Sequence, residues 1–477
     1  MEFYMSRIVI KNGCIIDPAR KTATVGDLVL ENNRVREVIE LAMAPDSYGD
    51  DVEFIDASGC FVTPGFIDIH THLREPGFEG KETIATGMDA AVRGGYTTIC
   101  PMPNTNPSLD SAPLIRQQFD IAARHGPIHV LPIGAVTLGR EGKVLAPLVE
   151  LAEAGAHGFS DDGSPVWDAH IMRQALLYSK MTGRPVMNHC EDLSIVRGAP
   201  MNEGAVATRL GLSGWPAAGE EVMIARDIAL AEETGGRLHI CHVSTAGGVE
   251  LIRAAKARGV RVTGEVTPHH LTMTDRWVLG SMEPWDGKGP YDPSQLAPYD
   301  TRTRVSPPLR TSEDVAALIA GLRDGTIDAV ATDHAPHTHV DKECEYGFAS
   351  PGFTGLELAL PMVLTLVQTM QIDIVELISR MTIGPAAIID VLPISLGPND
   401  PATLTIFDPA AIWKVTPEAL ASKGKNSPLM GQEMRGQVML TMMEGQIVYR
   451  REQFGESSRR EHGGAVGKLS GVFDEEE

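Results

Sequence analysis

Two histidines separated by one residue, His70 and His72, could bind a metal ion. They follow a short apolar run, and on an extended strand residues two apart point to the same side. Imidazole and carboxylate groups are the ligands that Zn²⁺ takes in sites that stay open to water. Further polar residues of these types stand at the ends of other apolar runs: Asp161, Asp162, His189, His242 and Asp333. We therefore predict a metal site built from strand-end residues.

Each of these features alone has a simpler interpretation. An isolated His-x-His pair in a strand is more often structural, a lone histidine after a strand is a weaker signal still, and Asp-Asp-Gly is usually a turn. Their joint placement favours the metal site, because chance would not put a histidine or aspartate at the exits of so many runs.

The segments that carry these residues alternate regularly. Short apolar runs are followed by longer segments with apolar residues at helical spacing that end in glycine. This pattern is typical of a parallel sheet and predicts the α/β class with a (β/α)8 TIM-like barrel, whose reacting groups lie at the C-terminal strand ends. The eight runs are residues 66–69, 96–100, 129–133, 157–160, 185–188, 238–241, 260–266 and 329–332.

The two ends of the chain differ from this middle part, because both contain short strand-like runs separated by polar turns. We predict that residues 1–63 and 395–450 form one small β-sandwich domain beside a barrel domain of residues 64–394. Residues 451–477 are polar and are expected to be a mobile tail. Residues 273–303 lack periodicity and are predicted to be a functional loop or insertion near the site.

Composition excludes several classes of protein. The chain has 41 basic and 63 acidic residues and a net charge of −22 without a basic stripe, so no nucleic-acid partner is expected. No stretch approaches the roughly 20 apolar residues of a membrane helix, and we expect no signal peptide. The 6 cysteines are scattered without CxxC pairs, which indicates reduced thiols in a cytoplasmic protein. An acidic protein can still bind an anion where metal ions or an arginine supply positive charge.

Seven motifs together resemble one family. In chain order they read PGFIDIHTHLREPG, GGYTTICPMPNTNP, GFSDDGSPV, NHCED, HVST, EVTPHH and ATDHAPH. They are similar to the motifs of the dihydroorotases of the amidohydrolase superfamily, in the bacterial long-chain type. The resemblance extends from about Lys11 to Tyr449, and the motifs stand in family order.

The resemblance implies a site with two zinc ions at the strand ends. It assigns His70, His72 and Asp333 to one ion, His189 and His242 to the other, and Asp162 with a hydroxide to the bridge. Many relatives, hydantoinases among them, bridge with a carbamylated lysine, but GAHGFSDDG contains no lysine. Between the two adjacent aspartates we favour Asp162, and we interpret Asp161 as a residue that fixes the loop.

The resemblance also implies a substrate that carries a carboxylate outside its ring. Arg74 stands two residues past His72, and an arginine fork suits a carboxylate. By their motif positions, Asn104 of MPNTNP and His337 of DHAPH would share this task. Without the motifs, Asn104 would be interpreted as a turn residue and His337 as a surface histidine.

Two substrate-side positions depart from the family pattern. Ser306 stands in VSPPLR, where the family commonly has an asparagine, and its side chain has a shorter reach. Pro351 and Gly352 occupy the positions of a covering segment that commonly reads like PFG, where main-chain groups could still serve. These changes leave the metal chemistry intact and bear on ring specificity.

The activity implied is the reversible cyclisation of N-carbamoyl-L-aspartate to L-dihydroorotate in pyrimidine synthesis, with Asp333 transferring the proton. One alternative is another cyclic amidase, such as a hydantoinase or allantoinase-like enzyme, which the missing lysine and LREPG disfavour. The other is a scaffold for aspartate transcarbamoylase, which the full ligand set disfavours. The partners expected are a small-molecule substrate, with a homo-oligomer and an association with aspartate transcarbamoylase left open.

Overall fold

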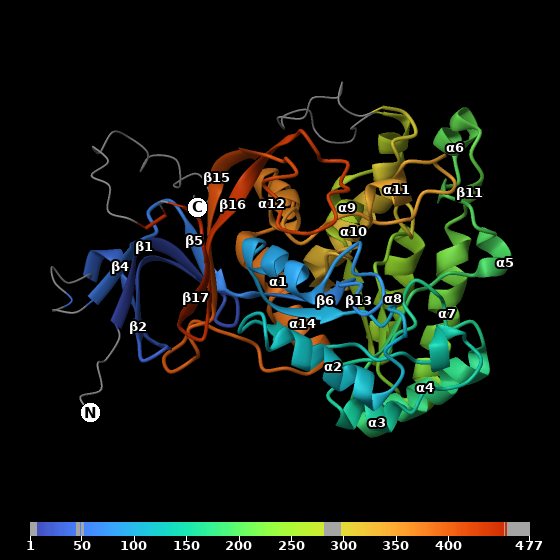
Figure 1. The fold of residues 1–477 in the computed structure, drawn as a ribbon, viewed down its shortest axis with the longest axis horizontal. Helices are drawn as coiled ribbons and strands as arrows, with labels where there is room; N and C mark the ends of the chain where they lie inside the picture. Colours follow the sequence, from blue (N-terminus) through green and yellow to red (C-terminus); the bar gives the residue numbers. More distant parts are fainter. Residues whose placement is uncertain (1–6, 44–47, 49–51, 281–296, 453, 456–477) are drawn as a thin grey trace.

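The computed structural model describes residues 7–43, 48, 52–280, 297–452 and 454–455. Figure 1 shows two parts, a β-sheet that combines the blue and red ends of the chain and a larger α/β part formed by the residues between them. The α/β part carries the candidate site. The terminal sheet packs against it through contacts of β16 (Glu433–Met443) with the helices α1 (Ile84–Arg93) and α12 (Ala359–Gln368).

Strands from both ends of the chain share one eight-stranded sheet, in the order β17-β16-β15-β5-β1-β2-β3 with β4 paired to β1. A register shift between Ile10 and Gly13 divides β1, so that its first half pairs with β4 and its second half with β5. The strands are β1 (Arg7–Asp17), β2 (Thr22–Glu31), β3 (Arg34–Glu40), β4 (Val52–Asp56), β5 (Phe61–Pro64), β15 (Leu404–Lys414), β16 (Glu433–Met443) and β17 (Gln446–Arg450).

The sheet encloses its own apolar core, which explains why ends so far apart in the sequence fold together. Ile10 and Leu28 from the first strands pack in one cluster with Leu404 and Leu440 from the last strands, and all four side chains are fully buried. Burial of apolar surface from both ends is the driving force for joining them. The packing of these strands into a sandwich stays a prediction.

The α/β part is built on parallel strands that are almost entirely buried, as expected where helices cover a parallel sheet. Its two sheets have the orders β6-β7-β8 and β14-β13-β12-β9. The strands are β6 (Phe66–Thr71), β7 (Tyr96–Pro101), β8 (His129–Val130), β9 (Val186–Asn188), β12 (Leu238–Ile240), β13 (Val262–Val266) and β14 (Ala329–Val330), and a separate pair is β10 (Met201–Asn202) with β11 (Gly214–Trp215).

Single bridges connect these two sheets. Phe159 pairs in parallel with Gly134 and with Val186 of β9, and Thr71 of β6 pairs in parallel with His334, which follows β14. The apolar run 157–160 therefore contributes one bridging residue where the sequence indicated a strand, because the chain enters a turn directly afterwards, closed by the Ser164 N–H and the Asp161 carbonyl.

Helices follow most of the parallel strands and cover them on the outside (Figure 1). They are α1 (Ile84–Arg93), α2 (Ala112–Ala122), α3 (Leu148–Glu153), α4 (Ala169–Thr182), α5 (Leu193–Val196), α6 (Ala205–Leu210), α7 (Ala218–Thr234), α8 (Ala246–Ala257), α9 (Pro268–Thr272), α10 (Ser312–Asp324), α11 (His339–Lys342), α12 (Ala359–Gln368), α13 (Ile374–Met381) and α14 (Ile383–Ile389). Short 3-10 turns lie at Leu41–Met43, Leu138–Arg140, Asp275–Leu279 and Thr301–Thr303.

Two predicted segments are only partly described. The predicted tail, 451–477, lies outside the described residues from 456 onward, and the predicted insertion, 273–303, lies outside them from 281 to 296. The ends of the insertion form 3-10 turns beside α9 and before α10. Within the described part of the chain, no helix is long and apolar enough to cross a membrane.

Candidate metal centre

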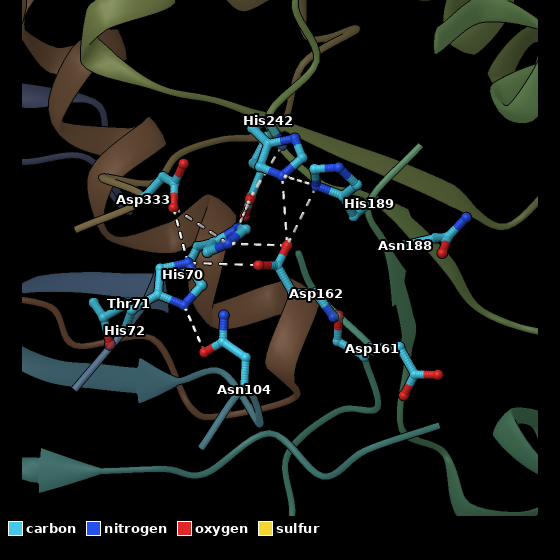
Figure 2. A network of polar contacts seen from close by, with 12 residues as sticks. His70, Thr71, His72, Asn104, Asp161, Asp162, Asn188, His189, His242 and Asp333 are labelled. Atoms are coloured by element: carbon cyan, nitrogen blue, oxygen red, sulfur yellow. Dashed lines mark hydrogen bonds and ion pairs between the residues drawn. The ribbon is translucent and has the colours of Figure 1, made fainter. Parts of the chain in front are cut away.

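His70 is the second-last residue of β6, and His72 directly follows the strand. Their ring centroids lie 5.3 Å apart, and both residues are at most 4% exposed. Each ring is held through Nδ1. The Nδ1 of His70 lies 2.5 Å from Glu265 Oε1, and the Nδ1 of His72 lies 2.9 Å from Asn104 Oδ1. A ring whose Nδ1–H donates to an oxygen keeps Nε2 free to bind a metal, and both Nε2 atoms face Asp162 (Figure 2).

Asp162 lies among all four candidate histidines (Figure 2). Its Oδ1 is 3.3 Å from His70 Nε2 and 3.4 Å from His242 Nε2. The same oxygen is 3.8 Å from His189 Nδ1, while Oδ2 is 3.5 Å from His72 Nε2. A carboxylate that reaches imidazoles from three different strands has the position of a group that contacts two cations.

The adjacent Asp161 points away from this cluster (Figure 2). Its Oδ1 accepts hydrogen bonds from the main-chain N–H groups of Val136 and Thr137 at 2.9 and 3.0 Å, and its Oδ2 accepts one from the Thr137 hydroxyl at 2.5 Å. Because both oxygens are used in this way, Asp161 ties its own loop to the segment that follows β8.

The remaining candidates lie on three further strand ends. His189 Nδ1 is 3.0 Å from His242 Nε2, and His189 Nε2 contacts Glu191 at 3.1 Å, which leaves Nδ1 to face Asp162. Asp333 Oδ1 lies 2.9 Å from His72 Nε2. His242 and Asp333 have positive φ angles of 33° and 48°, a backbone conformation that costs energy and is found preferentially at functional sites.

The electrostatics of the cluster fit a bound cation. Burial would raise the pKa of the Asp162 carboxyl, but the surrounding histidines hold it well below its usual range. Burial would lower the pKa of His70, but Asp162 and Glu265 raise it well above its usual value. His70 Nε2 and Asp162 Oδ1 are buried without a hydrogen-bond partner. A metal ion between them would satisfy both atoms, since buried polar atoms otherwise cost free energy.

Three groups of side chains have ligand atoms that all lie within 4.8 Å of one another. Two of them share Asp162 and contain the four histidines, which is the arrangement expected of a paired site. The third joins His70 to Cys241 and Glu265. The groups are His70–His72–Asp162, Asp162–His189–His242 and His70–Cys241–Glu265.

Glu265 on β13 is a functional candidate that sequence reasoning missed. It is 0% exposed and contacts the Nδ1 of His70, the Nε2 of His239 at 3.1 Å and the main-chain N–H of His242 at 3.3 Å. Burial would raise the pKa of Glu265, but His70 and His239 lower it to about 2, so it is ionised. The available signal was a carboxylate inside the predicted strand 260–266, close to its C-terminal end.

Arg74 and His337 lie together beside this cluster. Arg74 is half-buried and its Nε donates to the carbonyl of Pro336 at 3.3 Å. His337 Nε2 donates to the carbonyl of Pro351 at 2.9 Å, while its Nδ1 accepts from Lys81 Nζ at 3.4 Å. Burial, together with the charge of Arg74, lowers the pKa of His337 to about 2, so its imidazole is neutral. A cation beside a neutral imidazole suits an anionic group.

The other predicted substrate contacts differ in their surroundings. The side-chain carbonyl oxygen of Asn104 already contacts His72, a candidate metal ligand. Ser306 is half-buried on the segment that precedes α10. Gly352 has a φ of 110°, and its N–H and carbonyl are both engaged, the N–H by the Arg304 carbonyl at 2.8 Å and the carbonyl by Asn426 Nδ2 at 3.0 Å. Both main-chain groups of Gly352 are therefore already hydrogen-bonded within the protein.

The fold is shared with solved hydantoinases and dihydropyrimidinases. The solved L-hydantoinase of Arthrobacter aurescens matches with a TM-score of 0.78 and 24% identity, over 93% of this chain and 96% of that chain. A dihydropyrimidinase from Brevibacillus agri NCHU1002 matches with a TM-score of 0.74 and 20% identity, over 94% and 96%. At this identity, the likeness establishes the fold.

Sequence similarity then identifies the family. A family model described as "Dihydro-orotase-like" matches residues 59–247. The dihydroorotase of Syntrophus aciditrophicus (strain SB) is 44% identical over 94% of this chain and 100% of its own length. The dihydroorotase of Pelotomaculum thermopropionicum is 46% identical, over 93% of this chain and 98% of its own length. The chain belongs to the dihydroorotase family.

Proposed function

We propose that this chain interconverts N-carbamoyl-L-aspartate and L-dihydroorotate in a metal-dependent reaction of pyrimidine synthesis. The observation that carries this proposal is the position of Arg74 and His337 beside a cluster of four histidines and two aspartates. The cluster suits hydrolysis of a ring amide, and the arginine suits the carboxylate that distinguishes dihydroorotate from unsubstituted cyclic amides. Relatives of nearly full length named dihydroorotase support the same assignment.

The proposed cofactor is a pair of zinc ions. We assign His70, His72 and Asp333 to one ion, His189 and His242 to the other, and Asp162 to both, because Asp162 contacts all four histidines. The chemistry that zinc supplies in such a site is activation of a water near neutral pH and polarisation of the attacked carbonyl.

Asp333 is proposed to hold and move the proton. Burial would raise the pKa of Asp333, but its contact with His72 and the neighbouring charges hold it well below the usual range, so the carboxylate is ionised and can accept a proton. In the hydrolytic direction it would accept the proton of the attacking water and deliver it to the leaving ring nitrogen. The same carboxylate would work in reverse during ring closure.

The substrate would be oriented by groups on one side of the metal cluster. Arg74 is proposed to pair with the carboxylate outside the ring, beside the neutral His337. Asn104, whose carbonyl oxygen contacts His72, would offer its amide NH₂ to the same carboxylate. Ser306 and the Pro351-Gly352 segment are proposed to line the ring itself.

We infer that the parallel strands close into a (β/α)8 barrel. The Thr71–His334 bridge and the two bridges of Phe159 support this, because they connect the edges of the two parallel sheets. Residues 64–394 would form the barrel domain, and 1–63 with 395–450 the sandwich domain. A small-molecule substrate and a cytoplasmic location are proposed with this function, and size-exclusion chromatography alone and with aspartate transcarbamoylase would reveal a homo-oligomer or that partner.

The decisive experiment is hydrolysis of L-dihydroorotate by purified, zinc-loaded protein, followed as loss of ultraviolet absorbance. Faster turnover of 5-substituted hydantoins or allantoin would overturn the assignment in favour of another cyclic amidase. The position of equilibrium gives a second check. Ring closure consumes a proton, because an ionised carboxylate becomes part of a neutral amide, so acidic buffer should favour the ring and alkaline buffer the open form.

A further inference from the structure

The segment between β15 and β16 extends from the terminal sheet to the wall of the candidate site. It leaves the sheet beside α12 (Figure 1) and reaches the residues that follow β14. Asn426, in the second half of the segment, is 7% exposed, and Ser422 is 0% exposed. Neither residue belongs to the metal cluster, and the family model ends at residue 247, far before this segment.

Asn426 connects two separate pieces of the site with its side chain. Its Oδ1 accepts a hydrogen bond from the main-chain N–H of His337 at 2.8 Å, and its Nδ2 donates to the carbonyl of Gly352 at 3.0 Å. Its own carbonyl accepts from the N–H of Thr354 at 2.9 Å. One amide side chain therefore supplies both an acceptor and a donor to two loops that are 15 residues apart in the chain.

The segment that carries Asn426 is itself fixed in place. The Ser422 hydroxyl donates to Glu82 Oε2 at 2.5 Å, and the N–H of Lys423 donates to the same carboxylate. Gly424 approaches the barrel so closely that an added Cβ would lie 2.5 Å from the Pro336 side chain. Asn426 thus projects from a rigid support, as a residue must if it is to position others.

We infer that Asn426 is a positioning residue, which holds His337 in place beside the substrate carboxylate and Gly352 in place beside the substrate ring. This inference rests on the proposed function, because that function makes His337 and Gly352 substrate contacts. It also means that the terminal sheet contributes to the active site, through a segment far from every metal-ligand candidate in sequence. An asparagine fits the task because its short planar amide carries a donor and an acceptor side by side.

The test compares Asn426→Ala and Asn426→Asp with the wild type in the zinc-loaded full chain. Asn426→Ala leaves the His337 N–H and the Gly352 carbonyl without partners. It should raise KM for L-dihydroorotate about tenfold or more and change kcat much less. Buried groups left without hydrogen-bond partners cost free energy, so the two loops would move to find new partners and leave the positions that bind substrate. Asn426→Asp keeps the acceptor for His337 but sets a carboxylate oxygen against the Gly352 carbonyl, and it should loosen only the Gly352 loop.

Thr441→Val is the matched control. Thr441 is 0% exposed, and its hydroxyl donates to the Val92 carbonyl at 2.7 Å. Its loss also removes a partly buried hydrogen bond between the terminal sheet and the α/β part, but away from the site. Its KM should equal that of the wild type. Zinc content, measured in parallel, should be the same in all variants.

Amide hydrogen exchange separates this inference from the proposed function, because it requires no substrate. Asn426→Ala should speed exchange in peptides spanning 334–341 and 350–356, and Thr441→Val should not. If the wild type did not convert dihydroorotate, the proposed function would fall, while the exchange data would still decide whether Asn426 holds these loops. Unchanged exchange and unchanged KM in Asn426→Ala, or an equal KM change in Thr441→Val, would overturn the inference; if Asn426→Ala does not fold, Asn426→Asp decides on the same readouts.

Discussion

Removing the charge of Glu265 should weaken zinc binding while the fold persists. In Glu265→Gln the side chain keeps its shape and one oxygen, so the Nδ1–H of His70 retains an acceptor. The negative charge is lost from this 2.5 Å hydrogen bond. Hydrogen bonds to charged groups contribute about 1.5–3 kcal/mol and neutral ones about 0.5–1.5 kcal/mol, which leaves a loss of about 1–1.5 kcal/mol. That loss corresponds to roughly tenfold weaker zinc binding, at the low end of the roughly 10- to 100-fold range typical of partners of metal ligands.

The surroundings of Glu265 allow this substitution to be tested without unfolding the chain. His239, its other ring partner, contacts the Thr263 hydroxyl through Nδ1 at 2.9 Å. A hydroxyl can donate or accept, so His239 can change tautomer to suit the new amide. Glu220→Gln is the matched control, because Glu220 is 2% exposed and accepts from the N–H groups of Ser244 and Thr245 but contacts no proposed ligand.

The assay is competition for zinc with a chelator of known affinity, combined with a thermal melt of each apo-protein. Glu265→Gln should lose affinity by about tenfold or more, and Glu220→Gln should bind zinc like the wild type even where its melting temperature falls. Equal zinc affinity for Glu265→Gln and wild type, in a folded protein, would show that Glu265 does not orient His70.

Four further outcomes are expected. Asp333→Asn should lower kcat by about 10²-fold or more in both directions, and near-normal turnover would remove Asp333 as the proton carrier. Arg74→Met should raise KM for dihydroorotate by about tenfold or more with a smaller change in kcat; an unchanged KM contradicts the carboxylate contact. Removing metal with a chelator should lower the melting temperature, and added zinc should restore it, unless no metal binds. Burial raises the pKa of Glu357 from 4.5 to about 7. The folded chain then holds a proton that the unfolded chain has lost, so the free energy of unfolding should fall as the pH rises through that window. In urea titrations, Glu357→Gln should abolish this fall in the free energy of unfolding. The same pH dependence in Glu357→Gln and in the wild type would refute the raised pKa of Glu357 as its cause.

The sequence by itself determined which residues could meet. Alternation of apolar runs with helical segments indicates parallel strands, and the C-terminal ends of parallel strands share one edge. Six of the candidates at those exits, His70, His72, Asp162, His189, His242 and Asp333, do lie in one cluster, and Asp161 does not. The family was also predictable, because the strand-end motifs are specific and stand in order along the chain.

Only the tertiary structure decided how neighbours in sequence divide their tasks and which distant residues support the site. Asp161 and Asp162 are adjacent, yet one faces a loop and the other four histidines. Glu265 and Asn426 lie 195 and 89 residues from the partners they hold, His70 and His337. Periodicity specifies which face of its own element a residue occupies, but contacts between elements depend on how the whole chain packs, and that information is spread over the entire core.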